Sequence, residues 1–551
     1  MAFALDATRE CAALARGALQ RDLQNVPEHV AAPYRGALQL PDQELLGICC
    51  KGRGSLKVND GCWAEEQEHP DVERTGVATI PRGFWECCFL DVFDMLGRKR
   101  NAEDGLAPWM RRRLDHDFHP YEAALERGIS PPVPPSSGAA AAADLCHVWI
   151  PGPSRGAATS DIVYGEKCLR NVAWGELDAA LRILLRNVPQ GAWPSAGMAF
   201  VFSSHNWGIP PPSAARNDGV ADSCAGRVTA AKNRTRAGVC GGSVSQYLRP
   251  RLTCLGASPG DCAWPPGLWG YAKERVAKGL GLPPVFVSAL LPGVKEGAVL
   301  IPWEFVGAED ALAEARAARD TTHPWELRRP SLVWRGSSGE PGTMRQRGQD
   351  FLAALNSTAL MGSRLEDAVR KMLMPEVRGR LVLSSWFRPD FVDAKFSSGH
   401  GWLDQTPNVR DGLAKLGLLE HVGDGRRTNY MASTAFQEYR FGAILDGFSW
   451  ARNAARMLSL DLTPFLAETG LQFWYYEGLQ PWKEYVPLGA GLDAEEVYIK
   501  VLWARERHAS AREIARASAA FAERWYSATM QLSYLHAALV RYARLVYPKE
   551  S

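Results

Sequence analysis

The chain lacks cysteine in its C-terminal half. All 12 cysteines among its 551 residues lie between Cys11 and Cys262, and none has the Cys-x-x-Cys spacing of a zinc site. An even number of cysteines confined to one half of a chain favours disulfides over a metal centre. We therefore expect no metal site and predict disulfide bonds, whose pairing the sequence leaves open.

The chain also lacks long apolar runs and a strong net charge. No stretch reaches the roughly 18 uncharged apolar residues of a spanning helix, so we expect no membrane-spanning segment. The formal net charge of +2 gives no reason to expect nucleic acid as a partner. The predicted disulfides favour an oxidising compartment, namely the lumen of the endoplasmic reticulum or Golgi, or secretion. Residues 1–23 contain no apolar run typical of a secretory leader, so a cytoplasmic location is the alternative.

The length of the chain exceeds what one hydrophobic core usually holds, which predicts two or three domains. Residues 128–144, GISPPVPPSSGAAAAAD, combine proline clusters with an alanine run and predict a linker. Residues 197–202 are an apolar strand, and a helix feeding such a strand suggests a Rossmann-like α/β layer. We predict a cysteine-containing extension over 1–127, the linker over 128–144, an α/β domain with a long cysteine-rich loop over 145–330, a second α/β domain over 331–489, and C-terminal helices over 490–551.

Residues 437–488 predict a strand, a glycine turn and a helix that carries an arginine. Residues 439–445 are apolar enough for a buried strand, Asp446-Gly447 breaks it, and residues 451–458 have the composition of a helix. Arg452 then falls in the first turn of this helix. There its guanidinium and the free backbone N–H groups would point at the same anion, which predicts a phosphate-binding site.

This segment resembles glycosyltransferase family 90, the family of the Rumi-like protein O-glucosyltransferases and of the capsule-associated, lipopolysaccharide-modifying glycosyltransferases. The likeness is carried by Asp446-Gly447, by the Ser-x-x-Arg step over 449–452 and by the return LQPWKEYVP over 479–487. Upstream, VWRGSSG over 333–339 and VDAKF over 392–396 resemble two further motifs, in the order that the family shows. The resemblance extends from about residue 332 to the C-terminus.

The resemblance implies an α/β fold of the GT-B type, with two Rossmann-like domains and a closing C-terminal helical segment. It implies an inverting enzyme that transfers glucose or xylose from a UDP-sugar to a hydroxyl of a protein or polysaccharide acceptor. No cofactor and no metal would be required, because arginine would stabilise the departing UDP. The expected partners are therefore a UDP-sugar and a protein or glycan acceptor.

The resemblance also places donor-binding residues in the two loops that carry its motifs. Arg452 is the first candidate for stabilising the leaving phosphate, with Ser337 as a hydroxyl donor and Arg345 or Arg347 of the Arg-Gly-Ser loop as further cations. For each arginine, a surface ion pair is the alternative role. The full predicted donor set is Trp334, Arg335, Gly336, Ser337, Arg345, Arg347, Gly447, Phe448, Ser449 and Arg452.

The acceptor hydroxyl needs a general base, and here the sequence departs from the family. Related enzymes place an Asp just after the strand equivalent to residues 199–202, whereas this chain has no acid from Ser203 until Asp218. A neutral imidazole at His205 can accept the proton, which makes His205 the predicted base ahead of Asp218. Two alternatives stay open: a catalytically inactive member that binds nucleotide sugar or glycan, and a disulfide-rich extracellular adhesion protein.

Overall fold

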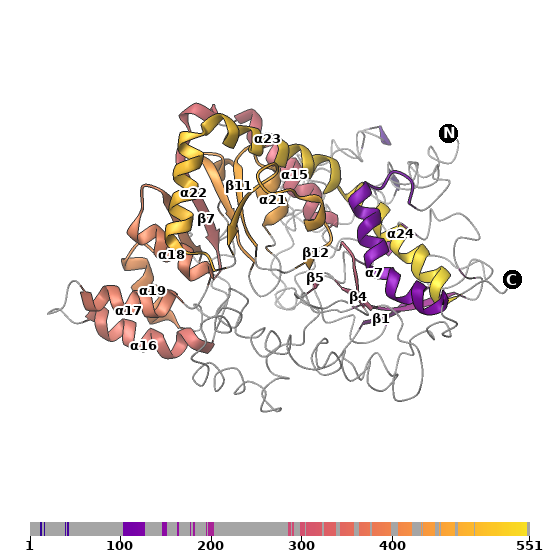
Figure 1. The fold of residues 1–551 in the computed structure, drawn as a ribbon, viewed down its shortest axis with the longest axis horizontal. Helices are drawn as coiled ribbons and strands as arrows, with labels where there is room; N and C mark the ends of the chain where they lie inside the picture. Colours follow the sequence, from indigo (N-terminus) through magenta and orange to yellow (C-terminus); the bar gives the residue numbers. More distant parts are fainter. Residues whose placement is uncertain are drawn as a thin grey trace.

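A computed structural model of the protein describes residues 103–126, 146–150, 162–164, 197–202 and, with gaps, 285–547, together with a few isolated positions (Figure 1). Within the last range, residues 338–341, 398–405, 421–430, 447–450 and 452 are among those that are not described.

Six parallel strands form one sheet in the C-terminal part of the chain. They are β7 (Arg329–Gly336), β8 (Val392–Ser397), β9 (Leu419–Glu420), β10 (Tyr439–Ile444), β11 (Thr463–Glu468) and β13 (Val486–Gly489). Their order across the sheet is β13-β11-β10-β7-β8-β9. The chain thus moves outward from β7 to β9, returns to the other side of β7 and moves outward again. This is the 3-2-1-4-5-6 order of dinucleotide-binding α/β sheets, in which the order reverses between β7 and β10.

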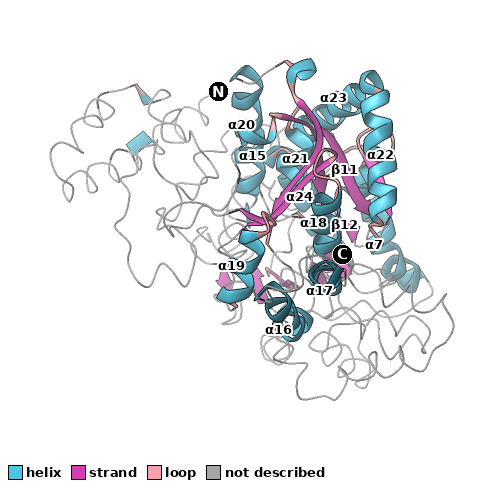
Figure 2. Cartoon of the chain, turned by 90° about the vertical axis from the view of Figure 1, so that its left-hand side faces the viewer, coloured by secondary structure: helices cyan, strands magenta, loops and turns pink. Residues whose placement is uncertain are grey.

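Helices cover both faces of this sheet. Leu332 and Trp334 of β7 lie in one apolar cluster with residues of α16 (Gly342–Asn356), α17 (Ser363–Leu373), α18 (Val377–Phe387), α19 (Pro407–Lys415) and α22 (Ala494–Glu506). Val333, which points to the opposite face, lies in a second cluster with α15 (Phe305–Thr321) and α21 (Ala454–Ser459). Figure 2 shows α15 and α21 on one side of the strands and α22 on the other. Burial on both faces explains the nearly continuous apolar runs of β10 and β11.

A second sheet precedes the first in the chain. It has the order β2-β1-β3-β4-β6 and contains β1 (Cys146–Ile150), β2 (Val163–Tyr164), β3 (Met198–Phe202), β4 (Val285–Val287) and β6 (Ala298–Leu300). Strands β3, β4 and β6 are parallel, and β1 is antiparallel to β2 and β3. The strand predicted at residues 197–202 is confirmed as β3. Cys146, at the start of β1, is disulfide-bonded, and the disulfides expected for the other cysteines stay a prediction.

Helix α7 (Pro108–Glu126) lies upstream of both sheets and packs against them. It runs beside α24 (Ala528–Val546) at the right of Figure 1 and contacts β6. Its Met110, Leu114 and Phe118 are fully buried in the same apolar cluster that contains Phe200 of β3 and Ile444 of β10. One apolar cluster therefore joins α7 and residues from both sheets.

The C-terminal residues form three helices, α22, α23 (His508–Trp525) and α24, as predicted for residues 490–551. The α/β class is likewise confirmed, whereas the GT-B arrangement and the domain limits stay predictions. In the described part of the chain, no helix combines the length and apolarity needed to span a bilayer.

Candidate functional site at the carboxyl edge of the parallel sheet

The two loops singled out in the sequence follow neighbouring central strands. The Arg-Gly-Ser motif ends β7, and Asp446-Gly447 follows β10. Strands β7 and β10 are parallel, with Gly442 opposite Val333, so both loops leave the same edge of the sheet. In sheets with this strand order, ligands bind at the carboxyl edge where the order reverses. The fold therefore brings the two predicted donor loops to the position that such sheets use for nucleotides.

Trp334 packs against the start of the first loop, the one that follows β7. Its side chain is 1% exposed and packs edge-on against Phe396 of β8, with ring centroids 6.2 Å apart. A Cβ atom on Gly336 would lie 2.5 Å from the Trp334 ring, so only glycine fits at this position. Trp334 and Gly336 thus fix the path of the chain towards Ser337.

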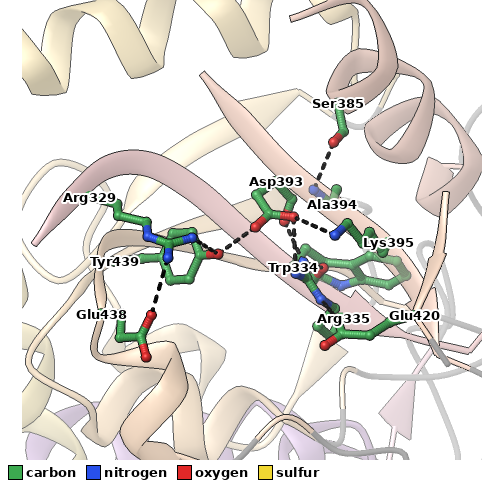
Figure 3. Close-up of polar contacts among 10 residues, drawn as sticks. All are labelled: Arg329, Trp334, Arg335, Ser385, Asp393, Ala394, Lys395, Glu420, Glu438 and Tyr439. Atoms are coloured by element: carbon green, nitrogen blue, oxygen red, sulfur yellow. Dashed lines mark hydrogen bonds and ion pairs between the residues drawn. The ribbon is translucent and has the colours of Figure 1, made fainter. Parts of the chain in front are cut away.

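Arg335 points to the opposite face of the sheet from Trp334, into a network of charged side chains (Figure 3). Its guanidinium lies 2.9 Å from an Asp393 carboxylate oxygen of β8 and also bonds Glu420 of β9. A further bond of 2.6 Å joins it to the Asp393 backbone carbonyl. Arg335 therefore ties β7 to β8 and β9, and its role in donor binding stays a prediction.

Tyr439, the first residue of β10, belongs to the same network. Its hydroxyl donates to the Asp393 carboxylate and accepts a hydrogen bond from Arg329, 3.3 Å away. Burial and this bond to Asp393 raise the pKa of Tyr439 to about 12. The hydroxyl therefore keeps its proton at neutral pH and acts as a fixed donor between strands.

Asp446 closes the second loop. This residue is 3% exposed, and its Oδ1 accepts hydrogen bonds from the Ala451 backbone N–H at 2.9 Å and from the Tyr476 hydroxyl at 3.0 Å. The first bond joins Asp446 to Ala451, and the second joins Asp446 to the 3-10 turn at Tyr476–Gly478. The sequence identified Asp446 as a strand breaker and as part of a family motif, but it did not indicate these two hydrogen bonds.

The helix after this loop begins later than predicted. Helix α21 covers Ala454–Ser459 with Asn453 as its N-cap, so Arg452 precedes the helix rather than lying in its first turn. The Ala451 carbonyl accepts the Ala454 N–H at 2.9 Å, a bond that spans three residues and not four, so a turn precedes the α-helix. Because α21 is only 6 residues long, phosphate binding at this edge is expected from the strand order and from Arg452, and not from the helix N-terminus.

Removing the Asp446 side chain is expected to destabilise this turn. The Asp446→Ala variant leaves the buried Ala451 N–H without its acceptor, which costs about 1–3 kcal/mol of unfolding free energy. The Asp446→Asn variant keeps an acceptor oxygen in place and is expected to lose less than half as much. Urea denaturation of both variants measures the difference, and equal losses would show that the charge, rather than the hydrogen-bond geometry, holds the turn.

The structure describes only some of the other predicted site residues. Arg345 and Arg347 lie in α16, which begins at Gly342, and not in the loop that precedes it. Gly447, Phe448, Ser449 and Arg452 lie outside the described residues, as does the predicted base His205. Their roles stay predictions.

Arg378 is a residue at this edge that the sequence did not reveal. It lies in the first turn of α18, and its guanidinium bonds the Ser337 carbonyl at 3.0 Å and the Leu445 carbonyl at 3.3 Å. It thereby contacts the chain directly after β7 and directly after β10. No motif surrounds Arg378, and 41 residues separate it from Ser337, so no local pattern could have indicated this contact.

Comparison with known proteins supports the resemblance seen in the sequence. Residues 303–550 match the sequence model of glycosyl transferase family 90. A comparison with curated proteins gives no match. The matched residues contain the whole six-stranded parallel sheet, both loops at its carboxyl edge and the three C-terminal helices. The family whose model matches residues 303–550 is thus the family that the sequence motifs resemble, and this match indicates a glycosyltransferase.

Proposed function

We propose that the protein transfers glucose or xylose from a UDP-sugar to a hydroxyl group of a protein or glycan acceptor, with inversion at the anomeric carbon and without a metal ion. The observation that carries the proposal is the position of the two loops. The Arg-Gly-Ser loop and the Asp-Gly loop follow the first and fourth strands of a sheet with the order 3-2-1-4-5-6. Diphosphate ligands bind at that point in such sheets.

The proposed reaction is a single displacement. The acceptor oxygen forms a bond to the anomeric carbon on the face opposite UDP, the bond from that carbon to the phosphate oxygen breaks, and the acceptor proton passes to a base. His205 is the proposed base. Negative charge develops on the departing phosphate, where a guanidinium can bind two oxygens at once. We assign this stabilisation to Arg452, assisted by the Ser337 hydroxyl.

The direct test is release of UDP. Purified protein incubated with UDP-glucose or UDP-xylose and a panel of protein and glycan acceptors is expected to release UDP in the presence of EDTA. Nuclear magnetic resonance of the product should show the anomeric configuration opposite to that of the donor. Release that requires an added divalent cation, or a product with retained configuration, would contradict the proposed mechanism.

One feature favours a second function, in which the protein binds a nucleotide sugar without transferring it. Residues 203–217 contain no carboxylate where relatives carry their Asp. Calorimetric titration with UDP separates the two functions when it is combined with the release assay. Binding of UDP with no release from either donor across the acceptor panel would favour the binding function, whereas release blocked by His205→Ala would favour the enzyme.

A further inference from the structure

Arg378 lies at the edge of the sheet where the chain leaves the two central strands, β7 and β10. After β7 the chain leads to α16, which packs on one face of the sheet, and after β10 it leads to α21 on the other face. Helix α18 precedes the parallel strand β8 and packs along it, so its first turn lies at the carboxyl edge. The Arg378 guanidinium lies 5.9 Å from the Trp334 ring centroid, above the indole that supports the first loop.

The two terminal nitrogens of the guanidinium bond the chain at the ends of two different strands, β7 and β10. Nη1 donates to the Ser337 carbonyl at 3.0 Å, and Nη2 donates to the Leu445 carbonyl at 3.3 Å. Because the guanidinium is planar and rigid, these two bonds together fix the distance between the two carbonyls. A lysine ammonium is a single point and cannot hold the same spacing.

A third contact orients a hydroxyl. Nη1 also lies 3.3 Å from Ser337 Oγ. A guanidinium has no acceptor, so Ser337 Oγ must accept in this bond. The Ser337 hydroxyl hydrogen is then directed away from Arg378 and can be donated to another oxygen.

We propose that Arg378 is a positioning residue, which sets the spacing of the two donor loops and turns the Ser337 hydroxyl into a hydrogen-bond donor towards the diphosphate. This inference rests on the proposed function, because it assumes that the loops bind the diphosphate of a UDP-sugar. A displacement of about 1 Å in such a constellation can cost on the order of 100-fold in rate. Arg378 therefore acts on donor binding and transfer through Ser337 and Leu445, without forming or breaking a bond itself.

The test compares Arg378→Lys with Arg380→Lys. Arg380 is a matched control, because it lies in the same helix and also bonds two backbone carbonyls, those of Met374 and Gly491, which do not belong to the two donor loops. We expect Arg378→Lys to raise the Kd for UDP about tenfold and to lower kcat/KM for the UDP-sugar by about 100-fold. Arg380→Lys is expected to stay within twofold of wild type in both, and the two variants should have similar melting temperatures.

Hydrogen exchange provides a readout that needs no donor. In the ligand-free protein, Arg378→Lys is expected to accelerate amide exchange in the peptides that contain residues 337–341 and 445–451, whereas Arg380→Lys is not. If wild type binds UDP but both lysine variants behave alike in affinity and in exchange, the inference is overturned. If wild type binds no UDP, the proposed function fails instead, and faster exchange confined to Arg378→Lys would still show that this side chain couples the two loops.

Discussion

Replacing Asp117 with alanine is expected to lower the free energy of unfolding by about 3–5 kcal/mol, because the change leaves a buried arginine without its carboxylate. The Asp117 side chain is 1% exposed and that of Arg113 is 7% exposed. Asp117 Oδ1 bonds Arg113 one turn earlier in α7, while Oδ2 accepts the Leu300 backbone N–H at 3.0 Å. Arg113 in turn donates to the Gln472 side chain at 2.8 Å.

These contacts explain why the loss of unfolding free energy in Asp117→Ala should be large. Leu300 ends β6 of the second sheet, and Gln472 lies in β12 (Gln472–Phe473), which pairs with β5 (Ala289–Leu290) in a separate two-stranded sheet. One buried ion pair on α7 therefore connects the helix to strands of two different sheets. Removing Asp117 breaks the contact with β6 and leaves the Arg113 charge desolvated, and both effects favour the unfolded chain.

The matched control is Asp115→Ala, two residues away on the same helix. The Asp115 side chain is 63% exposed and lies 2.6 Å from Arg541, which also bonds Glu122. Exposed pairs of this kind contribute about 0–1 kcal/mol. Urea denaturation followed by tryptophan fluorescence measures both variants, and equal destabilisation by the two changes would refute a bridging role for Asp117.

The sequence predicted the features of the fold that depend on local patterns of residues, such as apolar runs and composition. The apolar run at residues 439–445 predicted β10, and the composition of residues 490–551 predicted the C-terminal helices. The order of the family motifs also assigns the Arg-Gly-Ser and Asp-Gly loops to one donor site, and this assignment stays a prediction. The structure adds that these loops follow adjacent strands, because strand order depends on pairings between distant segments.

The features that were missed depend on contacts between residues far apart in the chain. Asp117 and Leu300 are 183 residues apart, and nothing near residues 108–126 indicates that this segment packs against β6. The start of α21 was predicted too early for a local reason. Ala451 and Arg452 are good helix formers, but Asn453 is not, and the Ala451 carbonyl bonds the Ala454 N–H in a turn that precedes the helix.

The second large effect concerns the chemistry. Arg452→Ala is expected to lower kcat for UDP release by about 100- to 1000-fold, the usual consequence of removing one group that stabilises developing negative charge. The affinity for the intact UDP-sugar should fall much less, because the charge on the leaving oxygen is fully developed only in the transition state. Steady-state kinetics with UDP-glucose or UDP-xylose separate kcat from KM.

Two further variants decide between the charge and the shape of Arg452. Arg452→Lys keeps the charge but loses the planar fork, so it should recover only part of the lost kcat if two phosphate oxygens are bound at once. Arg370→Ala serves as the control for loss of an arginine, because Arg370 forms a half-exposed ion pair with Glu366 within α17 and contacts neither donor loop in the described structure. Full activity of Arg452→Lys would mean that a point charge is sufficient. Full activity of Arg452→Ala would remove Arg452 from the mechanism, and the stabilising cation would then have to be sought among the other arginines near these loops, beginning with Arg345 and Arg347 of α16.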